Sequence, residues 1–143
     1  MKTIRLSPSL TLALVQAREA TKTYFRPALN EMGLTEQKWR VICTLYQYDE
    51  LENNHLAELT CILRPSLTGI VNRMAEQNLI IKSKDLHDQR VSLIKLTQAG
   101  RNYFESQALK MEESYKNIKE QYGAEKIQQL MELLHDLSKI KSN

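Results

Sequence analysis

Apolar residues recur at three- and four-residue steps along most of this 143-residue chain, a spacing typical of amphipathic helices. The first such run begins at Ser7 and Pro8, a capping hydroxyl followed by a proline suited to the first helical position. It ends at Gly33, and Pro27 inside it predicts a kink or a break. We therefore expect a long, bent N-terminal helix over about 7–32.

Three shorter helical runs follow, each with its own start signal. The first opens at Thr35 with Glu36, the second at Asn54, and the third has Pro65 at its expected first position. The third run keeps an apolar inner face and must stop at Asn78, a residue type that tolerates the left-handed conformation. These patterns predict three short helices in succession.

Two strand-like runs come next, LIIKSK and VSLIKLT, which are rich in β-branched and alternating residues. The segment DLHDQR joins them, so the pattern predicts a β-hairpin with a charged tip. Two long helical runs close the chain, at roughly 98–121 and 124–140, with a break near Gly123. The order of elements predicts a mainly α fold with a small β wing, which is a winged helix-turn-helix flanked by N- and C-terminal helices.

Composition is consistent with this fold and adds limits on class. The chain has 42% hydrophobic and 26% charged residues, as in one soluble globular domain. No apolar run approaches the roughly 20 residues that cross a bilayer, and the N-terminus lacks signal-peptide features. We therefore expect a cytoplasmic protein without a membrane anchor. The net charge of +3 permits a polyanionic partner but does not require one.

The helix that opens at Pro65, called the recognition helix below, has the features of a helix that reads DNA. Its first turns are small and polar, whereas its inner face is apolar. A major groove about 12 Å wide admits such a helix, and the N–H groups of its first turn point at phosphates. The side chains expected to face DNA from this helix are Arg64, Pro65, Ser66, Thr68, Asn72 and Arg73.

The hairpin tip places Asp88 two residues before Arg90. We expect Arg90 to reach a neighbouring minor groove while Asp88 holds its guanidinium in a fixed fork. The other wing residues expected near DNA are Lys82, Lys84, His87 and Gln89. The alternative for each is an ordinary solvated surface group, above all for Lys82 and Lys84.

From about 34 to 100 the chain resembles the MarR family of transcriptional regulators. The recognition-helix pattern of the family appears as SLTGIVNRMAEQNLI. Its wing signature D-x-x-D-x-R, followed by L-T-x-x-G after a strand, appears as Asp85, Asp88, Arg90, Leu96, Thr97 and Gly100. The chain departs from the family where Asn78 replaces a glycine, Leu86 a proline and Gln89 an arginine.

The resemblance implies one MarR-type domain over 1–143, with a DNA-binding lobe over about 34–97 and dimerisation helices over about 7–32 and 98–140. It implies a homodimer on a pseudo-palindromic operator, without a cofactor or a metal. The terminal runs are compatible with dimerisation, because they carry more apolar surface than a small three-helix core can cover. Packing within one subunit is the alternative for that surface.

Segments spread over nearly the whole chain, among them LTLALVQAREA, YFRPALN and GLTEQKWRVI, resemble family members that control degradation of hydroxyphenylacetate and homoprotocatechuate. This likeness implies a repressor that a small aromatic acid releases from DNA, with an arginine of the first helix on the carboxylate. Arg18 lies in that helix and has no carboxylate three or four positions away. The effector residues expected from the likeness are Arg18, Tyr24, Trp39, Arg40 and Cys43.

For Arg18 a structural ion pair is the alternative, and for Trp39 it is core packing. A regulator that responds to oxidation or to another small molecule, as in stress or efflux control, is the alternative function. We expect Cys43 and Cys61 to be reduced and to lie on inward helix faces, which would lower their reactivity. An enzyme is not expected, because the three histidines are scattered and no catalytic motif or phosphate loop is present.

Overall fold

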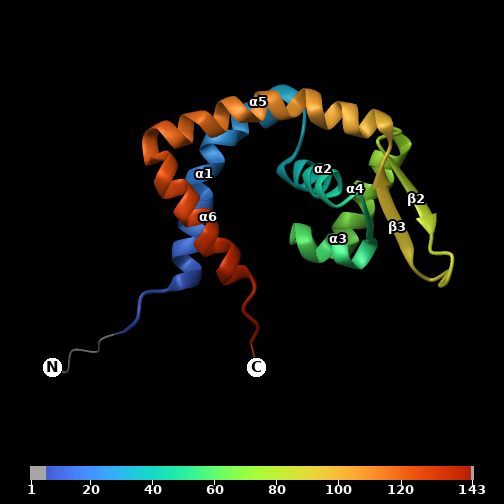
Figure 1. Cartoon of the computed structure of the whole chain (residues 1–143), viewed down its shortest axis with the longest axis horizontal. Helices are drawn as coiled ribbons and strands as arrows, with labels where there is room; N and C mark the ends of the chain where they lie inside the picture. The colour runs from blue at the N-terminus through green and yellow to red at the C-terminus, as the bar shows by residue number, and fades with distance from the viewer. Residues whose placement is uncertain (1–5, 143) are drawn as a thin grey trace. The chain divides into compact units, whose positions relative to one another are not determined.

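The computed structural model describes residues 6–142. Their elements follow in the order α1 (Leu10–Met32), α2 (Glu36–Tyr48), β1 (Glu50–Glu52), α3 (Asn53–Thr60), α4 (Arg64–Glu76), β2 (Ile80–Lys84), β3 (Ser92–Leu96), α5 (Gln98–Tyr122) and α6 (Ala124–Ser138) (Figure 1). The chain divides into two compact units. The central unit is Ala28–Met111, and the terminal unit comprises the described residues 6–27 and 112–142.

The three short helices of the central unit form where the sequence predicts them, with small shifts in their starts. Thr35 caps α2, since its Oγ1 accepts a hydrogen bond from Lys38 N at 3.1 Å. The helix α3 begins at Asn53, because its N-cap is Glu52, two residues before the predicted cap Asn54, and no side chain caps it. Asn78 has φ 60°, which confirms the left-handed turn predicted after the recognition helix, here α4.

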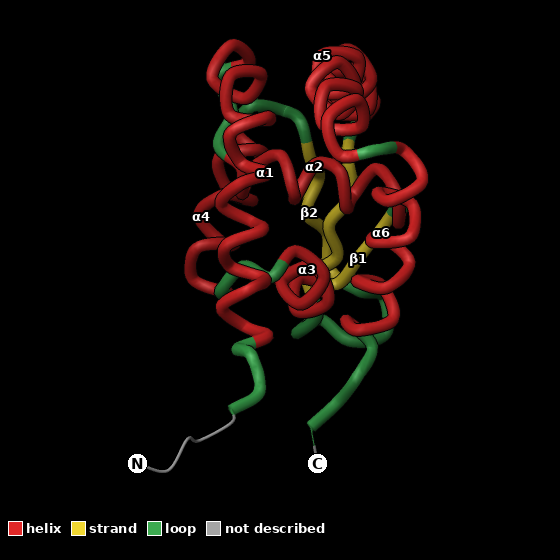
Figure 2. The backbone as a smooth tube through the Cα atoms, turned by 90° about the vertical axis from the view of Figure 1, so that its left-hand side faces the viewer, coloured by secondary structure: helices red, strands yellow, loops and turns green. Residues whose placement is uncertain are grey.

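The wing is part of a three-stranded antiparallel sheet, coloured yellow in Figure 2, with strand order β1-β3-β2. The predicted hairpin is confirmed: Ile80 pairs with Leu96, and Lys84 pairs with Ser92. The strand β1 was not predicted, because only Leu51 of its three residues is buried and the segment reads as a polar connector. Leu51 pairs with Ile94 of β3, so β1 fixes the end of α2 to the wing.

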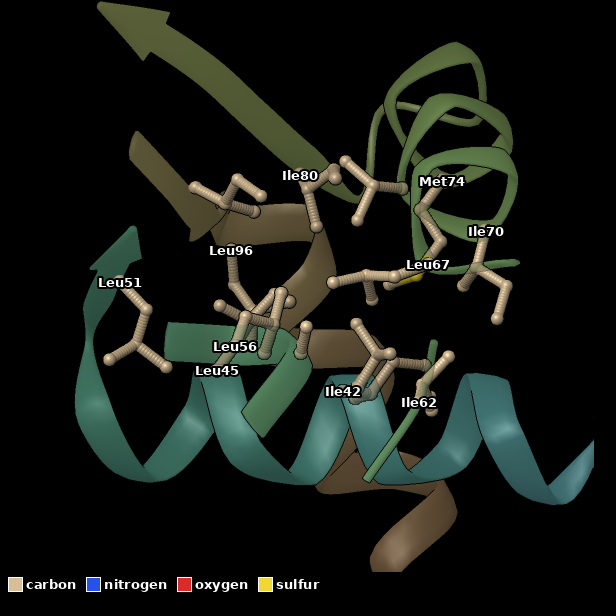
Figure 3. Packing of buried hydrophobic residues seen from close by; sticks show 14 residues of the cluster. Ile42, Leu45, Leu51, Leu56, Ile62, Leu67, Ile70, Met74, Ile80 and Leu96 are labelled. Carbon is tan, nitrogen blue, oxygen red and sulfur yellow. The ribbon is translucent and has the colours of Figure 1, made fainter. Parts of the chain in front are cut away.

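One hydrophobic core holds the central unit together. Ile42, Leu45, Leu67 and Met74 are at most 1% exposed, and Figure 3 shows side chains of α2 and α4 directed at one another with Ile80 and Leu96 of the strands beside them. Burial of each such side chain contributes about 1.5–3 kcal/mol to the free energy of unfolding. The core therefore fixes the recognition helix and the root of the wing in one rigid frame.

The motif L-T-x-x-G fastens the first turn of α5 to the turn after α4. Thr97 Oγ1 donates to Asn78 O at 2.7 Å and accepts from Gly100 N at 2.9 Å, which caps α5. A Cβ on Gly100 would lie 2.1 Å from Leu79 O, so only glycine fits. Aromatic stacking of Phe104 on Tyr46, with ring centroids 4.1 Å apart, adds a contact to α2.

The predicted start of the N-terminal helix is wrong in detail: α1 begins at Leu10 rather than at Ser7, and Ser9 Oγ accepts from Leu12 N at 3.2 Å. Of the two outcomes predicted for Pro27, a break does not occur, because α1 runs on to Met32, and a kink stays a prediction. The predicted boundary between the two last helices is confirmed at Gly123, which has φ 109°. Within the residues that the structure describes, no helix combines the length and apolar character needed to span a membrane.

Candidate DNA-binding surface and effector residues

Four hydrogen bonds close the tip of the wing. Asp85 Oδ1 accepts from His87 N at 2.7 Å and from Asp88 N at 3.1 Å. The backbone adds bonds from Asp85 N to Val91 O and from Val91 N to Asp88 O, both at 3.0 Å. An aspartate that bonds to the backbone two and three residues onward forms a defined turn. The tip therefore has a fixed shape, although Leu86 at its apex is 92% exposed.

The predicted pair of Asp88 and Arg90 is confirmed as a two-pronged contact. Arg90 Nε lies 3.1 Å from Asp88 Oδ1, and Arg90 Nη2 lies 3.2 Å from Oδ2. These hydrogen bonds, together with one from Arg90 N, lower the pKa of the Asp88 carboxyl. The Arg90 side chain is 90% exposed. The carboxylate thus aligns a guanidinium that still faces solvent, which is the arrangement expected of an arginine poised for a groove.

The recognition helix buries one face and exposes the other. Leu67, Ile70, Val71 and Met74 are buried. All the residues of α4 predicted to face DNA are exposed: Arg64, Pro65, Ser66, Thr68, Asn72 and Arg73. No side chain caps the helix at Leu63, so the N–H groups of its first turn remain available to an anion. The exposed face has the size and polarity that the groove requires, and its contacts with DNA stay a prediction.

Gly69 gives Arg73 room to lie along the recognition helix. A Cβ at Gly69 would be 3.4 Å from Arg73 Nη1, so the guanidinium passes close over that glycine. Thr68 Oγ1 donates to Arg64 O at 3.0 Å, which leaves the hydroxyl oxygen as an acceptor. The exposed face therefore carries a cation directed back toward its first turn, beside a small acceptor.

A polar cleft of about 250 Å³ lies between α4, the start of α3 and the root of the wing. Its lining includes Asn53, Asn54, Thr68, Lys82 and Arg90. Asn53 and Asn54 were not predicted as site residues, although two adjacent amide side chains at a helix start are a visible signal in the sequence. The other wing residues predicted to face DNA, Lys84, His87 and Gln89, are exposed.

Arg18 lies on α1 with a side chain that is half exposed. Its Nη1 is 3.9 Å from Glu19 Oε1, so the interpretation that it lacks a local carboxylate is wrong. Only positions three and four residues away were considered, whereas the contact is with the next residue. Tyr24, the other effector residue predicted in the terminal unit, donates its hydroxyl hydrogen to Gln121 Oε1 of α5.

The remaining predicted effector residues lie in the central unit, on α2. Trp39 stacks on Phe104 with ring centroids 5.5 Å apart. Arg40 Nη1 donates to Thr60 O at 2.7 Å, and the buried Nε, which has no hydrogen bond, lies 3.9 Å from Glu36 Oε1. These contacts give Trp39 and Arg40 packing roles in the lobe. Their roles toward an effector stay predictions, as do those of the residues on α1.

The two cysteines differ in exposure. Cys43 is partly buried, and burial raises the pKa of its thiol to about 12. Cys61 is exposed, which contradicts the inward position expected for it. The reason is local: Cys61 ends α3 with φ 55° and ψ 39°, and this left-handed turn rotates the side chain out of the helical pattern.

Comparison with known proteins gives consistent matches. A profile described as MarR family matches residues 34–92. The homoprotocatechuate degradative operon repressor of Escherichia coli is 44% identical over 128 residues, which are 90% of this chain and 86% of that protein. The transcriptional regulator PA4135 is 48% identical in sequence, and its crystal structure matches with a TM-score of 0.91 over 95% of this chain and 100% of that chain. NadR in complex with 4-hydroxyphenylacetate is 41% identical in sequence, and its crystal structure matches with a TM-score of 0.87 over 99% of this chain and 100% of that chain.

Proposed function

Because the chain belongs to the MarR family of transcriptional regulators, which act on DNA and not as enzymes, we propose that it represses an aromatic-acid catabolic operon. The operon is of the hydroxyphenylacetate or homoprotocatechuate type. The observation that carries this proposal is the likeness, over nearly the full length of both chains, to a repressor of homoprotocatechuate degradation. The relative crystallised with 4-hydroxyphenylacetate supports the same class of effector.

In the proposed complex the recognition helix enters the major groove and Arg90 enters the adjacent minor groove. The exposed face of α4 and the aligned guanidinium of Arg90 support this docking. Phosphate contacts position the protein, whereas contacts to base edges give the sequence preference. Ser66 and Thr68, near the start of the helix, are the proposed base readers.

The proposed active form is a homodimer on a pseudo-palindromic operator in the cytoplasm. Support comes from the apolar side chains that the terminal unit leaves exposed, among them Leu10, Leu12, Leu14, Val15, Leu130, Met131 and Leu133. Exposed apolar surface of this extent marks an interaction site. Two recognition helices would then meet half-sites about 34–36 Å apart, which is one turn of the duplex.

The proposed effector is a small aromatic carboxylate. Arg18 is the cation proposed to bind the carboxylate, and Tyr24, Trp39, Arg40 and Cys43 are proposed to line the site. The effector acts by population shift: it binds better to a form whose helices are wrongly spaced for the operator. A coupling free energy of about 1–3 kcal/mol gives about 5- to 150-fold release from DNA.

A displacement screen tests the proposal. The protein is bound to its own upstream DNA, and phenylacetates and benzoates are added one at a time while fluorescence anisotropy reports the bound fraction. We expect a hydroxylated phenylacetate to release the DNA, whereas the matching amide, which lacks the charge, leaves it bound. Release by the amide as well would contradict the role of a carboxylate.

An oxidation-responsive repressor is the second candidate, because Cys61 presents an exposed thiol. In the same assay this candidate predicts release by an oxidant and not by an aromatic carboxylate. An organic hydroperoxide would release the DNA, and replacing Cys61 by serine would abolish that release.

A further inference from the structure

A side-chain hydrogen bond joins the recognition helix to the wing, and neither the core nor the turn at the wing tip requires it. Lys82 Nζ of β2 donates a hydrogen bond to Asn72 Oδ1 of α4 at 2.7 Å. Both side chains are exposed. An exposed contact between two flexible side chains contributes little to stability. Its main effect is therefore on the orientation in which the two side chains are presented to a ligand.

The ammonium of Lys82 determines which way the Asn72 amide points. A lysine has three N–H donors and no acceptor, so the amide atom beside it must be the oxygen. The amide nitrogen, with its two donors, then lies in the same plane on the other side of the Cβ–Cγ bond. Asn72 thus has its acceptor engaged by Lys82 and its donors directed away from β2.

This orientation changes what an asparagine can read. Adenine is recognised in the major groove by an asparagine that gives one hydrogen bond and accepts another. Guanine presents N7 and O6 at the same edge, and both atoms are acceptors. An amide oxygen that already accepts from an ammonium has one lone pair left for the amino group of adenine, whereas both amide N–H donors remain free for the two acceptors of guanine. Asn72 lies one helical turn after Thr68, so both belong to the exposed face of α4.

We propose that Lys82 is a specificity-determining residue, which holds Asn72 so that the recognition helix presents N–H donors to guanine and discriminates against adenine. Lys82 acts through Asn72 and is a positioning residue for this contact. The inference rests on the proposed function, because it requires the exposed face of α4 to lie in a major groove. It deepens that function by assigning a base preference to one residue pair.

The test is a selection of bound duplexes from a pool of random sequence, with the wild type, Lys82→Met and Lys84→Met. Methionine keeps the length of the lysine stem but removes the charge and the donors. We expect the wild type to enrich guanine over adenine at one position of each half-site. In Lys82→Met that ratio should fall about fivefold or more, the effect of one hydrogen bond. Lys84→Met, the matched loss of one charge on β2, should weaken binding without changing the ratio.

Two further variants test whether Lys82 acts through Asn72. Asn72→Ala should remove the guanine preference, and Lys82→Met added to Asn72→Ala should change the ratio no further. Asn72→Asp retains a partner for Lys82 but offers no donor, so it should also lose the preference. Thermal unfolding of each variant shows whether the fold is intact, and we expect the melting temperatures to stay close to the wild-type value because both positions are exposed.

Three results would overturn the inference. Lys82→Met could weaken binding to all sequences alike and lower the salt slope by about one, which would make Lys82 a phosphate contact only. The two single variants could change base preference independently, which would separate Lys82 from Asn72. Failure of the wild type to bind its upstream DNA would overturn the proposed function together with this inference, whereas wild-type binding with an unchanged ratio in Lys82→Met overturns this inference alone.

Discussion

The central unit buries most of its large apolar side chains in one core, whereas the described part of the terminal unit leaves many of its own exposed. The fourteen residues of the hydrophobic core all lie in the central unit, and eight of them are at most 1% exposed. Among the described residues of the terminal unit, Ile127 is the buried hydrophobic side chain, whereas Leu133 is 66% exposed and Met131 56%. A lobe with a complete core can keep its shape alone. Exposed apolar side chains gathered on helices are typical of an interaction surface, so the contrast supports the proposed division into a DNA-binding lobe and dimerisation helices.

The largest expected effect comes from breaking the core. Leu67→Ala removes a fully buried side chain from the inner face of α4, and it should lower the free energy of unfolding by about 2–5 kcal/mol. Leu63→Ala is the matched control, since the same atoms are removed from a position that is 79% exposed and lies outside the proposed dimerisation helices. Urea unfolding, followed by circular dichroism at fixed protein concentration, measures both. An equal decrease in the free energy of unfolding of the two variants would contradict the conclusion that the buried core stabilises the central unit.

A charge in the exposed surface of α6 tests assembly. Leu133→Asp should raise the dissociation constant of the proposed dimer about tenfold or more, because one apolar side chain per subunit is replaced by a charge. Sedimentation velocity over a range of concentrations measures the shift. A protein that sediments as a monomer before the substitution would refute the dimer. An unchanged constant in Leu133→Asp would place the interface elsewhere.

Loss of Arg18 should separate sensing from DNA binding. Arg18→Ala is expected to bind the operator with wild-type affinity while losing the 5- to 150-fold release by an aromatic carboxylate. Arg26→Ala on the same helix is the matched control, and it should keep the release. Anisotropy titrations with and without effector measure both quantities. Normal release in Arg18→Ala would show that another cation binds the carboxylate.

Loss of Arg90 should act on DNA affinity alone. Arg90→Ala removes one aligned cation from the wing, so it should weaken binding to every sequence and flatten the dependence of log K on log salt by about one unit. Asp88→Asn is the informative partner variant, because it keeps the charge of Arg90 and removes the carboxylate that aligns it. It should weaken binding less than Arg90→Ala does. An unchanged salt slope in Arg90→Ala would refute the phosphate role.

The smallest expected effects concern the cysteines. With a pKa raised to about 12, the Cys43 thiol stays protonated at pH 8, and a protonated thiol does not react with iodoacetamide. Cys61 is exposed and should be the residue alkylated in the folded protein, as peptide mass spectrometry would show. Replacing Cys61 by serine should leave release by an aromatic carboxylate unchanged. Release by an organic hydroperoxide that is lost in Cys61→Ser would favour the oxidation-responsive alternative.

The features that the sequence predicted correctly are those that depend on residues only a few positions apart. The pairing of Asp88 with Arg90, the turn at Asn78 and the cap at Thr35 all arise within three residues, and the structure confirms them. The strand β1 was missed because its evidence is remote: Leu51 pairs with Ile94, more than forty positions away. Residue type alone could not reveal that partner.

Errors of detail came from side-chain directions set by the backbone. Cys61 was expected to face inward because its position continued the helical spacing, but a left-handed residue ends that spacing. The spacing of three and four residues along a helix does not reveal the contact of Arg18 with Glu19, because the long side chains of adjacent residues can also meet. The contact of Lys82 with Asn72 was likewise not predictable, since it depends on how a strand packs beside a helix.

At Gly100 the backbone of α5 packs directly against the backbone that follows the recognition helix. The carbonyl of Leu79 occupies the space where any other residue would place its Cβ, and Thr97 bonds to both sides of the junction. Any displacement of the first turn of α5 would therefore also displace the turn after α4 and the start of β2, since Thr97 and Gly100 contact both.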